Sequence, residues 1–432
     1  MTQDLISIIH VFGRRIYGLR KYKSKIENDL ELISLIFQRE AVNRMIKTHK
    51  SKIYPNATMR QVLKALFNYR RYCYNQALEI WNELYDESLI LEDKSFRPNE
   101  RKVRDELVGN KQDWQYLQSA RVLQLAVNDL AQSWKNYFNP KMPNHAQPRF
   151  KSKKRSRNVF KTNRAKVVDG RLRLDKPRGA GAWYDIKLAE APRWEGKIKL
   201  VTVVEEADGY YACLSIAIVD TSVEKHGKQV TAVDANIARF DYKDANGYQV
   251  VNTLPQRLLR LYQRITAYQR FLARKRMANP TNFRSNNYRA TRAKLQRDYQ
   301  QVTRIQEDLL NQLTAKLVAE NDVIAIEDLD NLHMRMNKRL AKNLHRSLFG
   351  KFKQMMAYKC AWHGVKLILV DQFYPSTQRC SQCGYIKTGA DKIGLDGNRK
   401  HHTGHDDYVC YQCGAKMRRD ENAIENLIQY AS

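Results

Sequence analysis

Four of the seven cysteines form two pairs whose spacing is typical of a metal site. The pairs are C-x-x-C-G knuckles, Cys380-Ser-Gln-Cys383-Gly and Cys410-Tyr-Gln-Cys413-Gly. This spacing lets two thiolates from one tight turn occupy adjacent corners of a tetrahedron, and the glycine suits that turn. A single pair could be a redox motif, whereas two pairs favour a structural Zn²⁺ with a closed shell of four thiolates. The polar stretch between the knuckles contains three histidines that could bind metal, but we interpret it as a solvated loop: His401, His402 and His405.

Three acidic residues suggest a second metal site of a different kind. Asp234 ends a hydrophobic strand pattern, Glu327 ends another, and Asp420 opens the last helical pattern. Because isolated buried charge is costly, clustered carboxylates imply a cation. Two Mg²⁺ ions about 4 Å apart would activate a water and stabilise the leaving oxygen in phosphodiester hydrolysis. Taken singly, Asp420 could be only a helix cap and Glu327 a strand-end turn, so the prediction depends on all three acids together.

The segments around these acids predict an RNase H-like α/β domain. One β pattern, TAVDANIARFDY, contains Asp234, and a hairpin turn at Asn246-Gly247 joins it to a second, YQVVNT. Long helical stretches follow from Pro255 to about Glu320. A strand at 323–327, a helix at 339–363, a strand at 365–371 and a helix from 420 complete the order. The cysteine knuckles interrupt this domain as a zinc-binding insert.

The N-terminal half predicts a helical module within a β-rich region. Residues 26–45 have the pattern of an amphipathic helix, and 47–54 that of a short strand ended by Pro55-Asn56. Two helices are expected at 59–85 and 114–138, separated by the charged stretch 86–113. Residues 171–220 have the alternation of β strands.

The charge balance favours a polyanionic partner. The chain has 432 residues, with 76 Lys+Arg against 45 Asp+Glu, and a formal net charge of +31. Nucleic acid is favoured over membrane because 24 Tyr, 13 Phe and 6 Trp provide stacking surfaces. No run approaches the roughly 18 apolar residues of a membrane span. The start carries an acid where a secretory signal carries base, and the odd cysteine count fits a reducing compartment, so we expect a cytoplasmic protein.

Two basic regions are candidate phosphate contacts. One lies within 149–166, which contains no acid and includes Phe150 and Phe160 among its basic residues. The other lies within 257–304, which contains 13 Lys or Arg residues and a single acid, Asp298. A solvated loop is the ordinary alternative for the first. The predicted contacts are Arg149, Lys151, Lys153, Lys154, Arg155, Arg157, Arg274, Lys275 and Arg276.

Several motifs together resemble one family. They are TAVDANIARF, VIAIEDLDNL, YPSTQRCSQCG, CYQCG and RRDENAIENL, preceded by KIYPNATMRQVLKALFNYRRYCYNQAL and QPRFKSKKRSRNVF. In order and spacing they resemble the TnpB proteins of insertion sequences, RNA-guided nucleases related to the compact type V CRISPR effectors. The resemblance spans about 46–432. One departure is Ala235-Asn236, where the family usually has Leu-Gly after the first acid.

The resemblance implies a domain plan and partners. We expect residues 1–45 to be a helical N-terminal extension. The resemblance implies a β-barrel wedge domain at 46–57 and 138–222 and a helical recognition domain at 58–137. It also implies a RuvC-like nuclease at 223–378 and 418–432, with a zinc ribbon that binds target nucleic acid at 379–417. The catalytic acids would be Asp234, Glu327 and Asp420. A monomer would bind a guide RNA encoded by the mobile element, read a short motif beside the target and cut double-stranded DNA at one RuvC site.

Three other functions are weighed against this one. A nuclease-dead RNA-guided repressor would be expected to lose one of the three acids, and all are present. Strand-joining transposases of the RNase H-like superfamily typically order their acids Asp, Asp, Glu, whereas the order here is Asp, Glu, Asp. A zinc-ribbon transcription factor would leave the acids and the helical half unexplained.

Overall fold

The chain folds into two compact units, described in turn. The computed structural model describes residues 44–140, 142, 145–175, 184–220, 222–329, 348–394, 397–398 and 400–432. One unit comprises residues up to Val204 together with Tyr211–Asp220, and the other Glu205–Tyr210 and Thr221–Ser432. The predicted N-terminal helix lies outside the described residues except at its end, where Arg44 already begins a strand. Among the described helices, none is long and apolar enough to cross a membrane.

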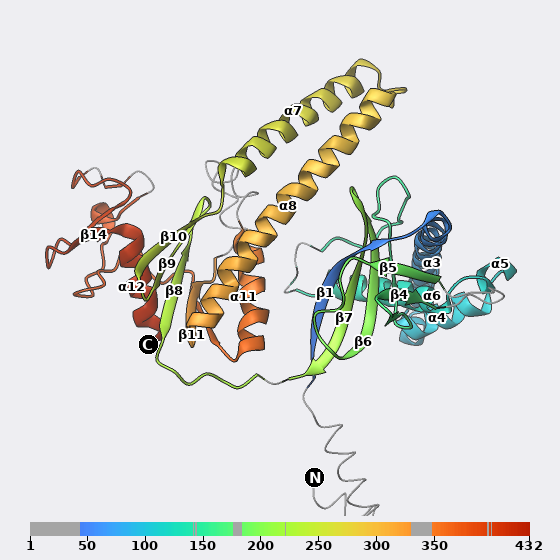
Figure 1. The fold of residues 1–432 in the computed structure, drawn as a ribbon, viewed down its shortest axis with the longest axis horizontal. Helices are drawn as coiled ribbons and strands as arrows, with labels where there is room; N and C mark the ends of the chain where they lie inside the picture. Colours follow the sequence, from blue (N-terminus) through green and yellow to red (C-terminus); the bar gives the residue numbers. More distant parts are fainter. Residues whose placement is uncertain are drawn as a thin grey trace, which may run out of the picture. The chain divides into compact units, whose positions relative to one another are not determined.

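The first unit contains a seven-stranded sheet (Figure 1). The neighbours run in the order β2-β6-β7-β1-β5-β4-β3. The described strand pairs do not join the ends β2 and β3, so barrel closure stays a prediction. The strands are β1 (Arg44–Tyr54), β2 (Val159–Thr162), β3 (Lys166–Val168), β4 (Arg171–Leu174), β5 (Tyr184–Leu188), β6 (Lys197–Glu206) and β7 (Gly209–Val219).

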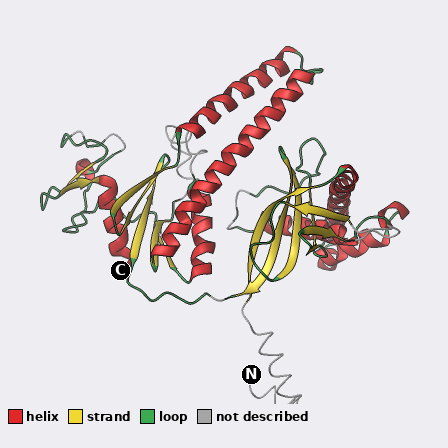
Figure 2. Cartoon of the chain, in the orientation of Figure 1, coloured by secondary structure: helices red, strands yellow, loops and turns green. Residues whose placement is uncertain are grey.

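Helices of the same unit form the predicted helical module (Figure 2). Helix α3 (Ala57–Ile90) starts after Asn56, whose side chain accepts a hydrogen bond from the Met59 N–H at 2.8 Å. It packs against α4 (Glu100–Gly109) and α6 (Ala120–Tyr137). Two expectations were wrong here. The charged stretch 86–113 contains η1 (Lys94–Phe96) and α4, and the helix expected at 114–138 is divided into α5 (Asp113–Tyr116) and α6, because Ser119 caps a new start.

The second unit contains the sheet that carries the acids. Its five strands lie in the order β10-β9-β8-β11-β12, in which β8, β11 and β12 are parallel while β9 and β10 are antiparallel. This is the predicted RNase H-like topology. The hairpin loop is Ala245-Asn246, one residue earlier than predicted, since Gly247 already pairs with Asp244. The strands are β8 (Val230–Ala235), β9 (Arg239–Asp244), β10 (Gly247–Asn252), β11 (Val323–Glu327) and β12 (Lys366–Val370).

Helices cover both faces of this sheet. On one face, Val233, Ile324 and Ile326 pack with α8 (Asn286–Glu320) and α11 (Phe349–His363). On the other, Ala232 and Ala325 pack with α12 (Arg419–Ala431). The small alanines let α12 approach closely. Helix α7 (Gln256–Ala278) lies along α8 (Figure 1), and the insert between β12 and α12 contains η2 (Gly389–Asp391), β13 (Asp407–Val409) and β14 (Lys416–Arg418).

Candidate active site and metal centre

Strand alternation brings Asp234 and Glu327 to one face of the sheet, and helix α12 brings Asp420 to the same face. Side chains two residues apart on a strand share a face, so Asp234 lies on the face of Ala232, and Glu327 on that of Ala325. That is the face covered by α12. The parallel register pairs Ile326 with Val233 and therefore puts the two acidic strand ends side by side. Asp420, in the first turn of α12, is buried beside them.

Electrostatics show that the three carboxylates interact. Burial raises the pKa of Asp234 well above its usual value, and the negative charges of Glu327 and Asp420 raise it further. Burial also raises the pKa of Glu327, although a hydrogen bond from the Ser376 hydroxyl to Oε1, at 2.5 Å, opposes this rise. Concentrated negative charge in a buried site is stabilised by a cation, which favours the ionised carboxylates.

Each carboxylate is held through one oxygen. Asn236 donates to Oδ2 of Asp234 at 3.3 Å, Ser376 donates to Oε1 of Glu327, and Arg239 donates to Oδ2 of Asp420. Among the described residues, the buried Oδ1 of Asp420 has no hydrogen-bond partner, and its ion pair with Arg419 spans 3.5 Å. An unsatisfied buried carboxylate oxygen beside two further carboxylates is the oxygen-rich environment that Mg²⁺ requires. The residues present therefore fit a divalent cation.

Two charged residues of this site were missed in the sequence. Asp241 pairs directly with Asp234 across β8 and β9, and it is 3% exposed. Arg239 Nε donates to Asp241 Oδ2 at 3.1 Å while its Nη2 contacts Asp420 and, at 3.2 Å, Asp406. Burial, followed by the charge of Asp420, raises the pKa of Asp241. The spacing of Arg239 and Asp241, two apart around the buried Phe240, could have indicated a charged pair on the inner face.

The Ala235-Asn236 departure has a structural explanation. The backbone N–H of Asn236 donates to the carbonyl of Arg239 at 2.9 Å and closes the tight connection between β8 and β9. Its side chain reaches back to Asp234. Asn236 thus joins the turn to the first carboxylate, which a glycine could not do.

The four predicted cysteines converge on one point. Their sulfur atoms all lie within 4.8 Å of one another, with Cys380 to Cys413 at 3.7 Å and Cys383 to Cys410 at 3.6 Å. A tetrahedral Zn²⁺ with bonds of about 2.3 Å separates its sulfurs by about 3.8 Å. Two sulfur pairs already have nearly this separation, so the cluster fits a tetrahedral zinc ion.

The two knuckles have the same backbone geometry. Gly384 and Gly414 have φ of +78° and +74°, and each donates its N–H to the carbonyl of the first cysteine of its knuckle, at 2.9 and 3.1 Å. A left-handed residue is easiest for glycine, which is why it follows each pair. The repeated turn points both thiolates of a knuckle to the same side.

The insert between the knuckles is more ordered than the solvated loop that we expected. Lys387 is fully buried, with Nζ 3.6 Å from the Tyr411 ring centroid, and it donates to the carbonyl of Val409. His401 stacks on the same ring at 3.7 Å and contacts Asp391. His405 Nδ1 lies 3.3 Å from Asp406 Oδ2, so His401 and His405 each have an acidic partner among the described residues.

The predicted phosphate contacts differ in exposure. Arg149, Lys153, Lys154 and Arg155 are exposed, as are Arg157 and the α7 residues Arg274, Lys275 and Arg276. Lys151 is different: its Nζ lies 3.2 Å from the Tyr74 ring centroid, and burial lowers its pKa to about 7. Phe160 is also buried and packs on Phe67. Lys151 and Phe160 therefore anchor the tract, and the exposed cations beside them are better placed for phosphate.

The sheet topology, the three acids and the cysteine cluster define an RNase H-like protein with a zinc-ribbon-type insert. Three family models match successive parts of the chain. "Probable transposase", of the OrfB group of IS605, matches residues 213–338, and "Cas12f1-like, TNB domain" matches 349–427. A "Helix-turn-helix domain" of the same OrfB group matches 45–89, which here is β1 followed by most of α3.

Two curated relatives match about three fifths and nine tenths of the chain. A Streptomyces pristinaespiralis protein named "Putative RNA-guided DNA endonuclease" is 27% identical over 88% of both chains. InsQ of Escherichia coli, with the same description, is 26% identical over 61% of this chain and 65% of its own. A structure titled Cas12f1-sgRNA-target DNA complex has a TM-score of 0.49 at 13% identity, covering 89% of this chain and 98% of its own. These matches make the chain similar to the OrfB group of IS605 and to proteins named TnpB-like.

Proposed function

We propose that this protein is a transposon-associated, RNA-guided DNA endonuclease. It binds a guide RNA, recognises a short motif beside its target, and cleaves DNA at a single RuvC site. The observation that carries the proposal is the carboxylate site, in which Asp234 and Glu327 on one sheet face and Asp420 on the helix that covers it are each held through one oxygen. The names of the relatives support the RNA-guided assignment.

The chain's own residues have distinct parts in the proposed reaction. Asp234, Glu327 and Asp420 would hold two Mg²⁺ ions, which when bound would activate water and stabilise the leaving oxygen. Asn236, Ser376 and Arg239 fix the orientation of these carboxylates before any ligand arrives, which reduces the reorganisation required for the reaction. The four thiolates would hold a structural Zn²⁺ in the ribbon.

The remaining assignments belong to the same proposal. The domain boundaries are those that the resemblance implies, with wedge, recognition, nuclease and ribbon regions. The partners are a guide RNA and double-stranded target DNA, the active species is a monomer, and the location is the prokaryotic cytosol or nucleoid. Free cysteines throughout the described chain fit a reducing compartment.

Cleavage of a guide-matched target tests the proposal directly. The RNA that copurifies with the protein is sequenced, and the complex is incubated with Mg²⁺ and DNA that matches the guide segment. We expect cutting of matched DNA and none of a scrambled target. Target binding without cleavage under these conditions would instead support a repressor, and absence of a defined copurifying RNA would refute RNA guidance.

The basic tract gives a separate test of nucleic-acid binding. Replacing Lys153, Lys154 and Arg155 by alanine should weaken RNA binding and reduce its salt dependence by roughly one slope unit per lost phosphate contact. The matched control is Lys151→Met, because Lys151 is held against Tyr74 and should leave that slope unchanged. If the salt dependence of RNA binding is unchanged in the triple variant, the tract is an ordinary solvated loop that does not contact phosphate.

A further inference from the structure

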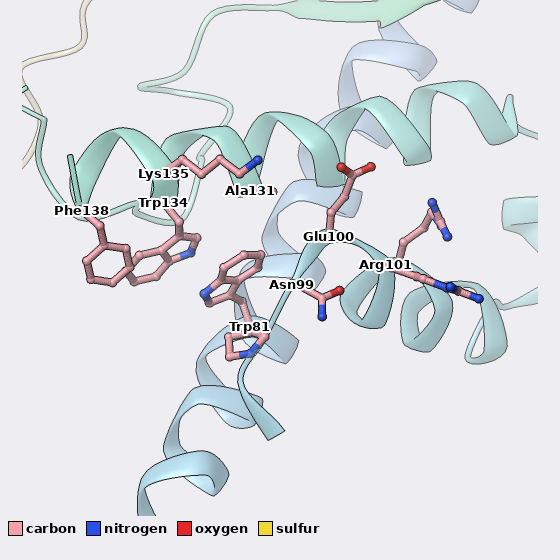
Figure 3. A pocket seen from close by; sticks show the side chains of 10 residues that line it. Trp81, Asn99, Glu100, Arg101, Ala131, Trp134, Lys135 and Phe138 are labelled. Carbon is pink, nitrogen blue, oxygen red and sulfur yellow. The ribbon is translucent and has the colours of Figure 1, made fainter. Parts of the chain in front are cut away.

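A pocket in the helical module has the composition of a nucleobase site. It lies where α3, the start of α4 and the end of α6 meet (Figure 3). Its volume is about 770 Å³. That volume is within the roughly 300–1,000 Å³ typical of small-ligand sites. Its walls include Trp81, Trp134 and Phe138, and its polar groups include Glu100, Arg101 and Lys135.

Three aromatic rings form a stack along one wall. Trp81 and Trp134 are parallel within 8° at a centroid distance of 5.9 Å, and Trp134 and Phe138 are within 19° at 5.6 Å. The two tryptophans are 9% and 7% exposed, whereas Phe138, at the end of the stack, is 59% exposed. The stack therefore ends in an accessible flat ring, and a planar base can extend it because every base has a π face.

The polar groups around the stack complement a nucleotide. Arg101, Arg104 and Lys135 line the pocket together with a single acid, Glu100, giving a net positive lining. The ion pairs of Arg101 and Arg104 with Asp105 are on the surface, at 3.6 and 3.0 Å, and such pairs exchange readily for phosphate. Glu100 accepts from Asn128 at 3.1 Å and is an acceptor for N–H groups of a base edge.

We propose that this pocket binds one unpaired nucleotide of an RNA strand, with its base stacked on Phe138 and its phosphate near Lys135. The inference depends on the proposed function, which supplies the RNA. RNA is the favoured source because loops and bulges of a folded RNA present unstacked bases to aromatic side chains, whereas duplex DNA keeps its bases inside. The site adds base stacking to the phosphate contacts made elsewhere.

The test uses a short single-stranded oligouridine RNA with one central 2-aminopurine, whose fluorescence falls on stacking. It is titrated into the full-length protein freed of nucleic acid. Phe138→Ala, alone and with Lys135→Ala, should weaken binding by about five- to a hundredfold and abolish the quenching. The control is the double variant Tyr116→Ala and Lys111→Ala. Lys111 Nζ lies 5.3 Å from the centroid of the exposed Tyr116 ring, and neither residue lines the pocket. Circular dichroism and melting verify that the variants fold.

Each outcome decides the proposal. Quenching that Phe138→Ala removes and the control retains supports it. Unchanged quenching in Phe138→Ala overturns the stacking, and a deoxyuridine probe that binds as tightly overturns the RNA assignment. Failure of the wild-type protein to bind or quench the RNA probe overturns it outright. Target DNA that stays uncut while the probe is still quenched refutes the proposed function alone, whereas cleavage without quenching refutes the pocket alone.

Discussion

The carboxylate site and the thiolate cluster are both suited to metal, but they are assembled in opposite ways. The thiolate cluster, Cys380, Cys383, Cys410 and Cys413, is built from two copies of one short turn, each positioned by its own glycine. The carboxylate site, Asp234, Glu327 and Asp420, takes one residue from each of two strands and a helix. A local motif can therefore arrange the thiolate ligands. The carboxylates repel one another, so a sheet and a helix must bring them together and neighbouring side chains must hold them.

The largest expected effect is at the carboxylate site. Asp234→Ala should reduce DNA cleavage by more than the roughly 10²–10³-fold cost of losing one transition-state donor, because it removes a ligand from the reacting centre. Binding of RNA and target, measured by mobility shift, should be nearly unchanged. Loss of binding in parallel with cleavage would mean that the residue supports the fold rather than the chemistry.

The next effect should come from opening the thiolate cluster. Cys380→Ser should lower the zinc content from about one ion per chain and lower the melting temperature, because structural zinc contributes folding free energy. Elemental analysis and thermal melting provide the measurements. Cys213→Ser, outside the cluster, is the control. Full zinc retention in Cys380→Ser would refute a four-thiolate site.

A smaller effect should follow from removing the residue that holds Asp420. Arg239→Ala should reduce the rate of DNA cleavage by about 10–100-fold, as for other groups that orient metal ligands. It should also raise the Mg²⁺ concentration that gives half-maximal cleavage. Arg239→Lys should restore part of the activity, since a lysine keeps the charge but cannot contact Asp241, Asp406 and Asp420 together. Slower cleavage with an unaltered Mg²⁺ dependence would contradict this positioning role.

The smallest effect should occur where the ribbon insert reaches the carboxylate site. The side chain of Asp406 is 51% exposed and contacts Arg239. Without Asp406, Arg239 would still contact Asp241 and Asp420. Asp406→Ala should therefore reduce cleavage by less than about fivefold, as expected for an exposed ion pair. Both variants are measured in the same cleavage assay. If Asp406→Ala lost as much activity as Arg239→Ala, the thiolate cluster's insert and the carboxylate site would depend on each other.

The residues of both regions were predictable to different depths. The knuckle spacing indicated all four thiolates, and hydrophobic runs ending in acids indicated Asp234 and Glu327. The inner-face pair Arg239 and Asp241 was overlooked because a charged pair inside a strand resembles surface alternation until the covering helix is known. Lys151 was predicted to contact phosphate, yet packing against Tyr74 makes it an anchor. In both cases the deciding neighbours come from distant segments, and the phosphate contact of Lys151 stays a prediction.

Residue types and their spacing were enough to establish the nuclease-like domain order, the thiolate cluster and the preference for nucleic acid, because each depends on local periodicity or composition. Folding was needed to bring α12 over the face of Ala232 and Ala325, to put Asp241 opposite Asp234, and to form the aromatic pocket between α3, α4 and α6. These features join residues far apart in the chain. Their positions follow from strand register and helix packing, which are collective properties that no short stretch of sequence contains.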